Sequence, residues 1–277
     1  MNHHPTKIGI TSIQRNRNPW ILEWLAFHMI VGFTDFHIYC HKCTDGMEGT
    51  LQRLGQHYPV FAYIIDTDDR PQLAAYQHAW RTQGQVVDWM AFIDGDEFLF
   101  PTEMPDMASA LAQFQPLDLS AIAAYWVCYG SSGRMVEPAG LVIENFPRHS
   151  RSSFHGNRHM KSIVRGGENI LIDGAHLFKT PRGTYDDRMR LVTHPQLLDP
   201  AVQPTYEKFR INHYAVQSFE FFKTTKQNMG AADCNPHLVR PTTWYHEYDR
   251  NECDDGLSYN FLIRMKLKMQ ELEAVLA

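Results

Sequence analysis

The 277-residue sequence lacks the signatures of several large protein classes. No stretch approaches the ~18 apolar residues of a membrane span, and the N-terminal residues contain no apolar run typical of a secretion signal. The Gly-x-Gly-x-x-Gly and Gly-x-x-x-x-Gly-Lys-Ser/Thr patterns are both missing, so the sequence has neither the dinucleotide-binding nor the P-loop fingerprint. The first two absences predict a cytoplasmic protein. The last two indicate that any ligand-binding site is built without a glycine-rich phosphate-binding loop.

Cysteine is scarce, and its arrangement favours free thiols. The chain has an odd number of cysteines and no secretion signal, so we expect all five to be reduced: Cys40, Cys43, Cys128, Cys234 and Cys253. Cys40 and Cys43 have the Cys-x-x-Cys spacing, but the sequence has no second pair to complete a four-ligand zinc site, and no thioredoxin-like pattern surrounds them. The sequence therefore does not favour a zinc or redox site here.

An excess of basic residues is also missing. Lys and Arg number 26 against 31 Asp and Glu, which gives a net charge of −5 and a pI near 6.3. A chain of this charge has no broad positive surface for nucleic acid, so we expect no such partner. With 44% hydrophobic and 21% charged residues, the composition is that of a globular protein.

Strands and helices alternate four times within the first hundred residues. The hydrophobic patterns predict strands over residues 7–13, 35–40, 60–66 and from 86 onward, separated by helices over 20–31, 49–58 and 72–83. This order is typical of a right-handed, mostly parallel α/β sheet. The second half is less regular, with strands expected over 121–129, 161–165, 168–172 and 209–214 and helices over 218–228 and 256–277. Arg264, Lys266 and Lys268 on the last helix leave open a peripheral contact with a membrane.

The stretch from Val86 to Pro101 combines a long apolar run with three carboxylates at its end. Asp94 and Asp96 flank Gly95, which lets the chain bend. Two carboxylates placed at the end of a strand suit Mg²⁺ or Mn²⁺, which keeps positions open for substrate phosphates. A polar turn after a core strand is the alternative, but ligands gather at the carboxyl ends of strands in open α/β sheets.

Five motifs, in order along residues 7–257, resemble glycosyltransferase family 92 and related family-2-like enzymes. They are Arg15-Asn16-Arg17 with Glu23-Trp24 to Gly32; Asp88 to Phe98; Lys161 to Arg165 with His176; Asn212-His213-Tyr214 with Ser218, Glu220 and Phe222; and His246 to Asn251 with Asp254-Asp255. Two positions depart from the family pattern, because Arg17 stands where the family usually has an acid and Gly166 where it usually has a proline.

The resemblance implies a single GT-A domain over residues 1–277, with a nucleotide-sugar half at about 7–101, an acceptor half at about 102–255 and a C-terminal helix at 256–277. Asp94 and Asp96 match the Asp-x-Asp motif, which holds Mn²⁺ or Mg²⁺ against the donor diphosphate, and His213 matches a histidine that reaches the same metal. The implied activity is transfer of a hexose, with inversion, from a UDP-sugar to a glycan or glycolipid acceptor.

The remaining site residues are assigned less directly. Glu144, which matches a family acid in the acceptor half, and Asp249 are the alternatives for the base that an inverting displacement needs. Lys161 and Arg165 share one face of a predicted strand and are expected to offset diphosphate charge. Three residues that follow strands are expected at the nucleotide: Arg15, Asn16 and Asp66. Trp126 and Tyr129 are candidates for stacking on a sugar ring.

Two other classes of function compete with this interpretation. A metal-dependent phosphohydrolase would use the same acids, but such enzymes usually need a second set of metal ligands close to the first, and the sequence offers no His/Asp cluster beyond His213. A catalytically idle sugar-binding module is the third, and the intact set of Asp94, Asp96 and His213 argues against it.

Overall fold

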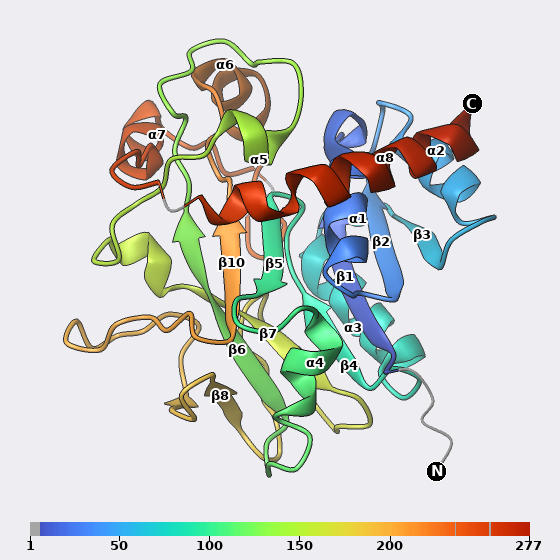
Figure 1. The fold of residues 1–277 in the computed structure, drawn as a ribbon, viewed down its shortest axis with the longest axis vertical. Coiled ribbons are helices and arrows are strands. Elements are labelled where there is room, and N and C mark those ends of the chain that lie inside the picture. Colours follow the sequence, from blue (N-terminus) through green and yellow to red (C-terminus); the bar gives the residue numbers. More distant parts are fainter. Residues whose placement is uncertain (1–5, 236, 255) are drawn as a thin grey trace.

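A mixed, mostly parallel β-sheet forms the centre of the computed structural model, which describes residues 6–235, 237–254 and 256–277 (Figure 1). The strands follow the order β3-β2-β1-β4-β7-β6-β10-β5 across the sheet. The first four strands in the chain, β1 (Ile8–Gln14), β2 (Asp35–His41), β3 (Val60–Ile65) and β4 (Trp89–Phe92), are parallel neighbours. Their carboxyl ends therefore meet at one edge of the sheet.

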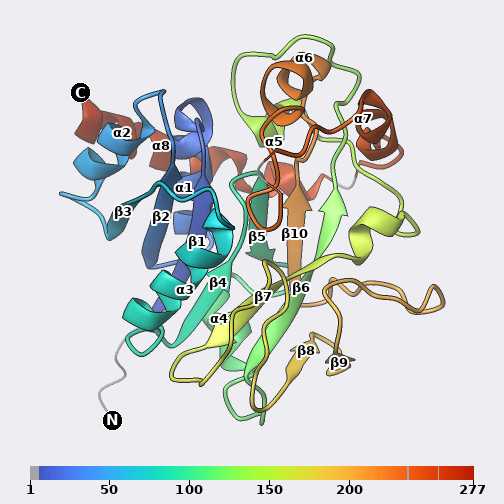
Figure 2. The same ribbon diagram turned by 180° about the vertical axis from the view of Figure 1, so that it is seen from behind.

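Helices cover both faces of this half of the sheet (Figures 1 and 2). The helices α1 (Asn18–Ile30), α2 (Met47–Leu54) and the C-terminal α8 (Leu262–Leu276) contribute to one hydrophobic core, whereas α3 (Pro71–Gln83) packs into a second core on the other side. Because both faces are covered, β1 and β2 are buried along their whole length, as is usual for parallel strands between two helical layers.

The second half of the chain extends the same sheet. The strands β6 (Ala121–Cys128) and β10 (Phe209–His213) are parallel to each other, while β7 (Met160–Arg165) runs antiparallel to β4 and β6, and β5 (Glu97–Pro101) antiparallel to β10. The short strands β8 (Thr184–Asp186) and β9 (Leu191–Val192) form an outer hairpin beside β6. Since β4 pairs with β7, the two predicted halves share one sheet.

Short helices connect these strands. They are α4 (Met107–Ala112), α5 (Val142–Asn145), a 3-10 turn η1 (His155–Arg158), α6 (Phe219–Phe221), the π-helical turn η2 (Phe222–Lys226), α7 (Thr242–Tyr248) and a 3-10 turn η3 (Leu257–Phe261). The elements α5, α6 and α7 lie together beyond the carboxyl ends of β6 and β10 (Figure 1). The predicted fold class, a mostly parallel α/β sheet flanked by helices, is confirmed.

Three predicted elements differ in detail. The apolar run from Val86 is divided into β4 and β5, because the chain turns at Gly95-Asp96 between them. The strand expected over residues 168–172 is wrong, since only Leu171 pairs there, in an isolated bridge with Lys179. The helix expected over residues 218–228 is split, with α6 passing into the π-helical turn η2.

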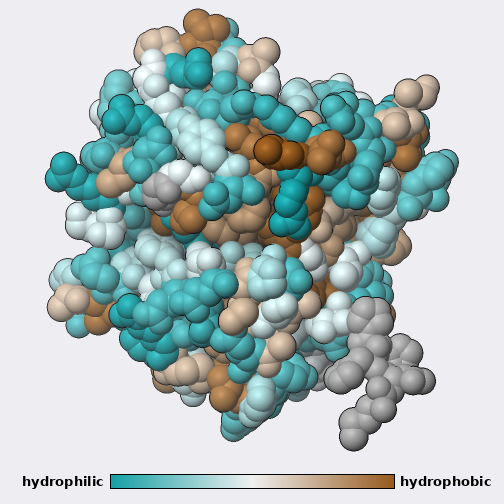
Figure 3. Space-filling model, in the orientation of Figure 1, coloured by the Kyte–Doolittle hydropathy of each residue, from teal (hydrophilic) through white to brown (hydrophobic). Residues whose placement is uncertain are grey.

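The C-terminal helix α8 exposes part of its apolar side chains. Ile263 is 78% exposed and Leu267 57% exposed, and Figure 3 shows an apolar patch over the middle of the helix. The basic side chains nearby all have partners, because Arg264 donates to the Ile30 carbonyl, Lys266 pairs with Glu144 and Lys268 pairs with Glu271. Among the helices that the structure describes, none combines the length and apolar character needed to cross a bilayer, and peripheral membrane contact stays a prediction.

Candidate active site

A cavity of about 380 Å³ lies at the carboxyl edge of the sheet. Its lining comes from the ends of β1, β2, β4 and β10, from α7, and from the segment 226–240 that follows the π-helical turn. The predicted metal ligands Asp94, Asp96 and His213 all line it, as do Arg15 and Trp126. Residues that are far apart in the sequence therefore meet where an open α/β sheet usually binds its ligand.

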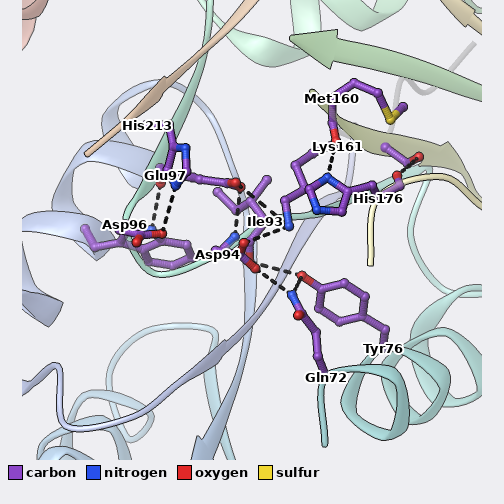
Figure 4. Close-up of polar contacts among 12 residues, drawn as sticks. Gln72, Tyr76, Ile93, Asp94, Asp96, Glu97, Met160, Lys161, His176 and His213 are labelled. Atoms are coloured by element: carbon purple, nitrogen blue, oxygen red, sulfur yellow. Dashed lines mark hydrogen bonds and ion pairs between the residues drawn. The ribbon is translucent and has the colours of Figure 1, made fainter. Parts of the chain in front are cut away.

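The Asp94 carboxylate is held by two side chains from different elements (Figure 4). Lys161 on β7 places its Nζ 2.8 Å from Asp94 Oδ2, and Gln72 on α3 donates from Nε2 to Asp94 Oδ1 at 2.6 Å. The nearby charge of Lys161 keeps the pKa of Asp94 below its ordinary value despite burial. Lys161 was expected to offset diphosphate charge, but its ammonium group is used on Asp94.

Glu97, the first residue of β5, completes this buried cluster. Its side chain is 0% exposed, its Oε2 accepts from the Asp94 backbone N–H at 2.9 Å, and its Oε1 lies 3.8 Å from Lys161 Nζ. Burial raises the pKa of Glu97, whereas the two carboxylates raise the pKa of Lys161 against the effect of its own burial. The cluster fixes the turn that carries the Asp-Gly-Asp sequence.

Asp96 lies between a cation and an imidazole. Lys226, the last residue of the π-helical turn, pairs with Asp96 Oδ2, and His213 Nε2 lies 3.7 Å from Asp96 Oδ1. The charge of Lys226 holds the pKa of Asp96 below its ordinary value even though the carboxylate is buried. Asp96 is therefore ionised, and one of its oxygens already carries a positive partner.

His213 belongs to a group of aromatic side chains around Trp126. Its ring centroid lies 4.1 Å from that of Trp126, and the rings of His159 and His176 lie 4.9 and 5.4 Å from Trp126. Burial lowers the pKa of His213 to about 4 and that of His176 to about 3, so both rings are neutral near pH 7. His159 was not anticipated, because a single histidine in a loop carries no signal in the sequence.

Positive side chains line the same cavity beside these acids. Arg15 and Arg17 follow β1, and Arg240 reaches the cavity from the segment 226–240. Arg17 is 5% exposed, and its guanidinium lies 4.6 Å from the centroid of the Trp20 ring and donates from Nη2 to the Gly95 carbonyl at 3.1 Å. Its Nε is buried without a hydrogen-bond acceptor. A buried cation of this kind favours an anion in the cavity.

Besides Lys161, three residues expected at the nucleotide are not part of the cavity lining. Arg165 lies at the other end of β7, where its guanidinium donates to the carbonyls of Phe114, Gln115 and Leu117. The Asn16 side chain accepts from the Thr44 backbone N–H at 2.7 Å, and Asp66 is exposed after β3. Position after a strand predicted the edge of the sheet correctly but did not predict the direction of each side chain.

Neither residue proposed as the base lines the cavity. Glu144 lies on α5 at the surface and pairs with Lys266 of α8 at 2.9 Å. Asp249 accepts from the backbone N–H of Ser131 and from Asn251 Nδ2, and so fixes the turn after β6. A base must reach the acceptor hydroxyl, so these positions do not support the role for either carboxylate. Asp233, which the sequence reasoning missed, lines the cavity instead.

No preformed metal centre is present among the residues that the structure describes, because no three or more His, Cys, Asp or Glu side chains there are arranged to hold an ion. Asp96 and His213 nevertheless offer a carboxylate oxygen and a neutral imidazole nitrogen to one cavity. That donor pair fits Mn²⁺ or Mg²⁺ when the cation also binds phosphate oxygens.

Two solved structures are similar to part of this chain. Staphylococcus aureus TarS (residues 1–349, in complex with UDP) is 15% identical over 58% of this chain and 47% of its own, with a TM-score of 0.37. The mannosyltransferase PcManGT of Pyrobaculum calidifontis, in complex with GDP-Man and Mn²⁺, is 16% identical over 44% of this chain and 36% of its own, with a TM-score of 0.34.

Curated relatives cover more of the chain. Family 92 proteins of Arabidopsis thaliana and of rice (Oryza sativa subsp. japonica) are 24% and 25% identical over 84% and 90% of this chain. The chain spans 42% and 43% of their length, which is less than half. The model of glycosyltransferase family 92 matches residues 4–165, more than half of the chain and including the strand before Asp94. The resemblance seen in the sequence is thereby confirmed, and the chain belongs to glycosyltransferase family 92.

Proposed function

We propose that this chain is a metal-dependent, inverting glycosyltransferase that moves a hexose from a UDP-sugar to a glycan or glycolipid acceptor. The observation that carries this proposal is that Asp94, Asp96 and His213 line the same cavity at the carboxyl edge of the sheet. Membership of glycosyltransferase family 92 supports the reaction class.

Mn²⁺ or Mg²⁺ is the cofactor that these residues suit. Asp96 and His213 would hold the ion, and Asp94, fixed by Lys161 and Gln72, would keep its charge beside them. Such an ion stabilises the negative charge that develops on a departing diphosphate. The neutral state of His213 is necessary for this role, because a protonated imidazole has no lone pair for a metal.

The chain's own cations and aromatic side chains supply the remaining contacts. Arg15, Arg17 and Arg240 present positive charge to the anionic donor, and Trp126 and Trp244 offer flat apolar surfaces for a sugar ring. The Arg17 charge is preorganised, because its buried guanidinium is fixed by the Gly95 carbonyl and the Trp20 ring. Preorganised positive charge of this kind lowers the free energy of a transition state in which a diphosphate leaves.

Inversion needs a base, and the cavity restricts the choice. Among the described residues, the carboxylates that line it are Asp94, Asp96 and Asp233. Asp94 and Asp96 are paired with Lys161 and Lys226, so we assign the role to Asp233 in place of Glu144 and Asp249. The Asp233 carboxylate would take the proton of the acceptor hydroxyl. At the same time the hydroxyl oxygen would bond to the anomeric carbon, and the bond from that carbon to the diphosphate oxygen would break.

Calorimetric titration with UDP tests the proposal. We expect UDP to bind wild-type protein with Mn²⁺ or Mg²⁺ and at least about tenfold more weakly with a chelator, a loss of about 1.4 kcal/mol. Asp96→Asn should remove the effect of the metal, whereas Asp66→Asn, an exposed carboxylate outside the cavity, should keep it. Equal affinity with metal and with chelator would remove the basis for the metal-dependent mechanism.

Turnover distinguishes the transferase from its alternatives. Incubation with UDP-, GDP- and dTDP-sugars should release nucleoside diphosphate from one of them, slowly to water and faster with an acceptor glycan. A phosphohydrolase would instead release inorganic phosphate from simple phosphate esters, and an inactive sugar-binding module would bind glycans and release neither product.

A further inference from the structure

The ion pair between Lys226 and Asp96 occupies the position that the proposed cation needs. Lys226 contacts Asp96 Oδ2, His213 lies beside Oδ1, and the side chains of Lys226 and Asp96 are only 14% and 10% exposed. A divalent cation on this carboxylate would meet the Lys226 ammonium at close range, where like charges repel strongly because little water screens them. The lysine and the cation therefore compete for Asp96.

Hydrogen bonds from Arg240 and Gln227 hold the backbone that carries Lys226. Arg240 donates from Nη1 to the carbonyls of Lys226 at 3.2 Å and of Gly230 at 2.8 Å. Gln227 and Arg240 also exchange hydrogen bonds, because the Arg240 N–H donates to the Gln227 carbonyl and Gln227 Nε2 to the Arg240 carbonyl. With its main chain fixed, a displaced Lys226 ammonium stays within the reach of its four methylene groups and remains at the cavity.

The balance of charge shows what a displaced ammonium would contact. Among the described residues, the cavity is lined by four basic side chains, Arg15, Arg17, Lys226 and Arg240, and by three acids, Asp94, Asp96 and Asp233. The buried Lys161 on β7 already pairs with Asp94. A cation on Asp96 would therefore leave the Lys226 ammonium without its acidic partner in the cavity. An anionic ligand such as a diphosphate would provide a new partner for this ammonium.

We propose that Lys226 exchanges partners during donor binding: it neutralises Asp96 while the cavity holds no cation, and it moves to the donor diphosphate when a divalent cation takes its place on Asp96. This inference rests on the proposed function. It adds a positioning role for Lys226, which lies outside the Asp94-Gly95-Asp96 motif. It makes metal and donor binding mutually supportive, because the cation releases the lysine that the diphosphate needs.

The two halves of the exchange predict opposite effects of one substitution. In Lys226→Met, Mn²⁺ alone, followed by the electron paramagnetic resonance of free Mn²⁺, should bind about tenfold more tightly than in wild type, because its competitor is gone. With saturating Mn²⁺, UDP should bind the same variant about tenfold more weakly in calorimetry, because one cation on the diphosphate is lost. Lys226→Arg keeps the positive charge and should change both affinities less than Lys226→Met does, although the larger guanidinium does not reproduce the ammonium contact.

Lys223→Met is the matched control, because Lys223 lies in the same π-helical turn but is exposed and does not line the cavity. It should leave both affinities unchanged, and thermal melts should show that each variant folds. A Mn²⁺ affinity of Lys226→Met no higher than that of wild type would overturn the exchange, as would an unchanged affinity for UDP. Failure of wild-type protein to bind UDP with metal would instead overturn the proposed function, and the Mn²⁺ titration would still decide whether Lys226 competes for Asp96.

Discussion

Lys161 Nζ lies 2.8 Å from Asp94 Oδ2, with the lysine side chain 1% exposed and the aspartate 32% exposed. The ion pair joins β7 of the second half of the chain to the turn after β4 of the first. The buried Glu97 also lies close to this pair, with its Oε1 3.8 Å from the same ammonium. Lys161 therefore positions the acids of the site rather than a ligand.

Removal of Lys161 should destabilise the fold strongly. In Lys161→Met, Asp94 loses its cationic partner and Glu97 is left wholly buried beside an uncompensated carboxylate, and losing one partner of a buried ion pair costs about 3–5 kcal/mol. Urea unfolding at pH 7, followed by circular dichroism, measures this loss. The effect should be smaller below pH 5, where the carboxylates can be protonated.

Lys179→Met provides the comparison for Lys161→Met. Lys179 pairs with Asp173 at 2.7 Å, but its side chain is 72% exposed, and such surface pairs contribute about 1 kcal/mol or less. A similar loss of stability in the two variants would show that the buried Lys161 ion pair contributes no more to the free energy of unfolding than a surface pair does. Full stability of Lys161→Met would contradict the assignment of Lys161 as the counter-ion of both acids.

The regular part of the sequence predicted the structure most reliably. Alternating and helical periodicities predicted β1, β2, β3 and α3 to within a residue or two, because two-layer burial of parallel strands leaves a strong apolar pattern. His28, on the buried face of α1, is a hydrogen-bonded core residue. Its Nδ1 donates to the Trp24 carbonyl at 2.8 Å, and its Nε2 accepts from the Leu99 N–H at 3.2 Å.

The candidate site was predictable only where a motif stood at the end of a strand. Asp94, Asp96 and His213 reach one cavity because β4 and β10 point the same way in the sheet. Lys226 is 130 residues from Asp96 in the sequence and ends an irregular turn, so no local spacing connects the two. Local pattern likewise does not distinguish the candidate bases, since Glu144 and Asp233 differ in tertiary position: only Asp233 lines the cavity.

Glu23 should make the stability of the fold depend on pH near neutrality. Its carboxylate is 2% exposed and accepts from the backbone N–H groups of Val142 at 2.8 Å and Ile143 at 3.0 Å. Burial raises its pKa from 4.5 to about 7, so between these values the folded chain holds a proton that the unfolded chain releases. The stability contributed by this group is complete below about pH 4.5 and is lost as the pH rises through 7.

The variant Glu23→Gln isolates this contribution, because the amide does not titrate. Between pH 4.5 and 8, the free energy of unfolding of wild-type protein should fall relative to that of the variant by on the order of 3 kcal/mol. Urea unfolding curves at pH 5, 6, 7 and 8 supply the comparison. Parallel pH dependences for the two proteins would show that Glu23 titrates alike in the folded and unfolded chains.

Asp233 is the residue through which the proposed reaction can be tested most directly. Asp233→Asn keeps the size of the side chain but removes the proton acceptor, so kcat for sugar transfer should fall by about 10²–10⁴-fold while the affinity for UDP changes little. Glu144→Gln and Asp249→Asn should keep kcat within about threefold of wild type if each variant folds, since neither carboxylate lines the cavity. The acidic limb of the pH profile of kcat should disappear in Asp233→Asn alone, because only a base must lose its proton before transfer. A normal rate for Asp233→Asn together with a large loss in Glu144→Gln would return the role to the surface acid on α5, and would require α5 to approach the cavity when the acceptor binds.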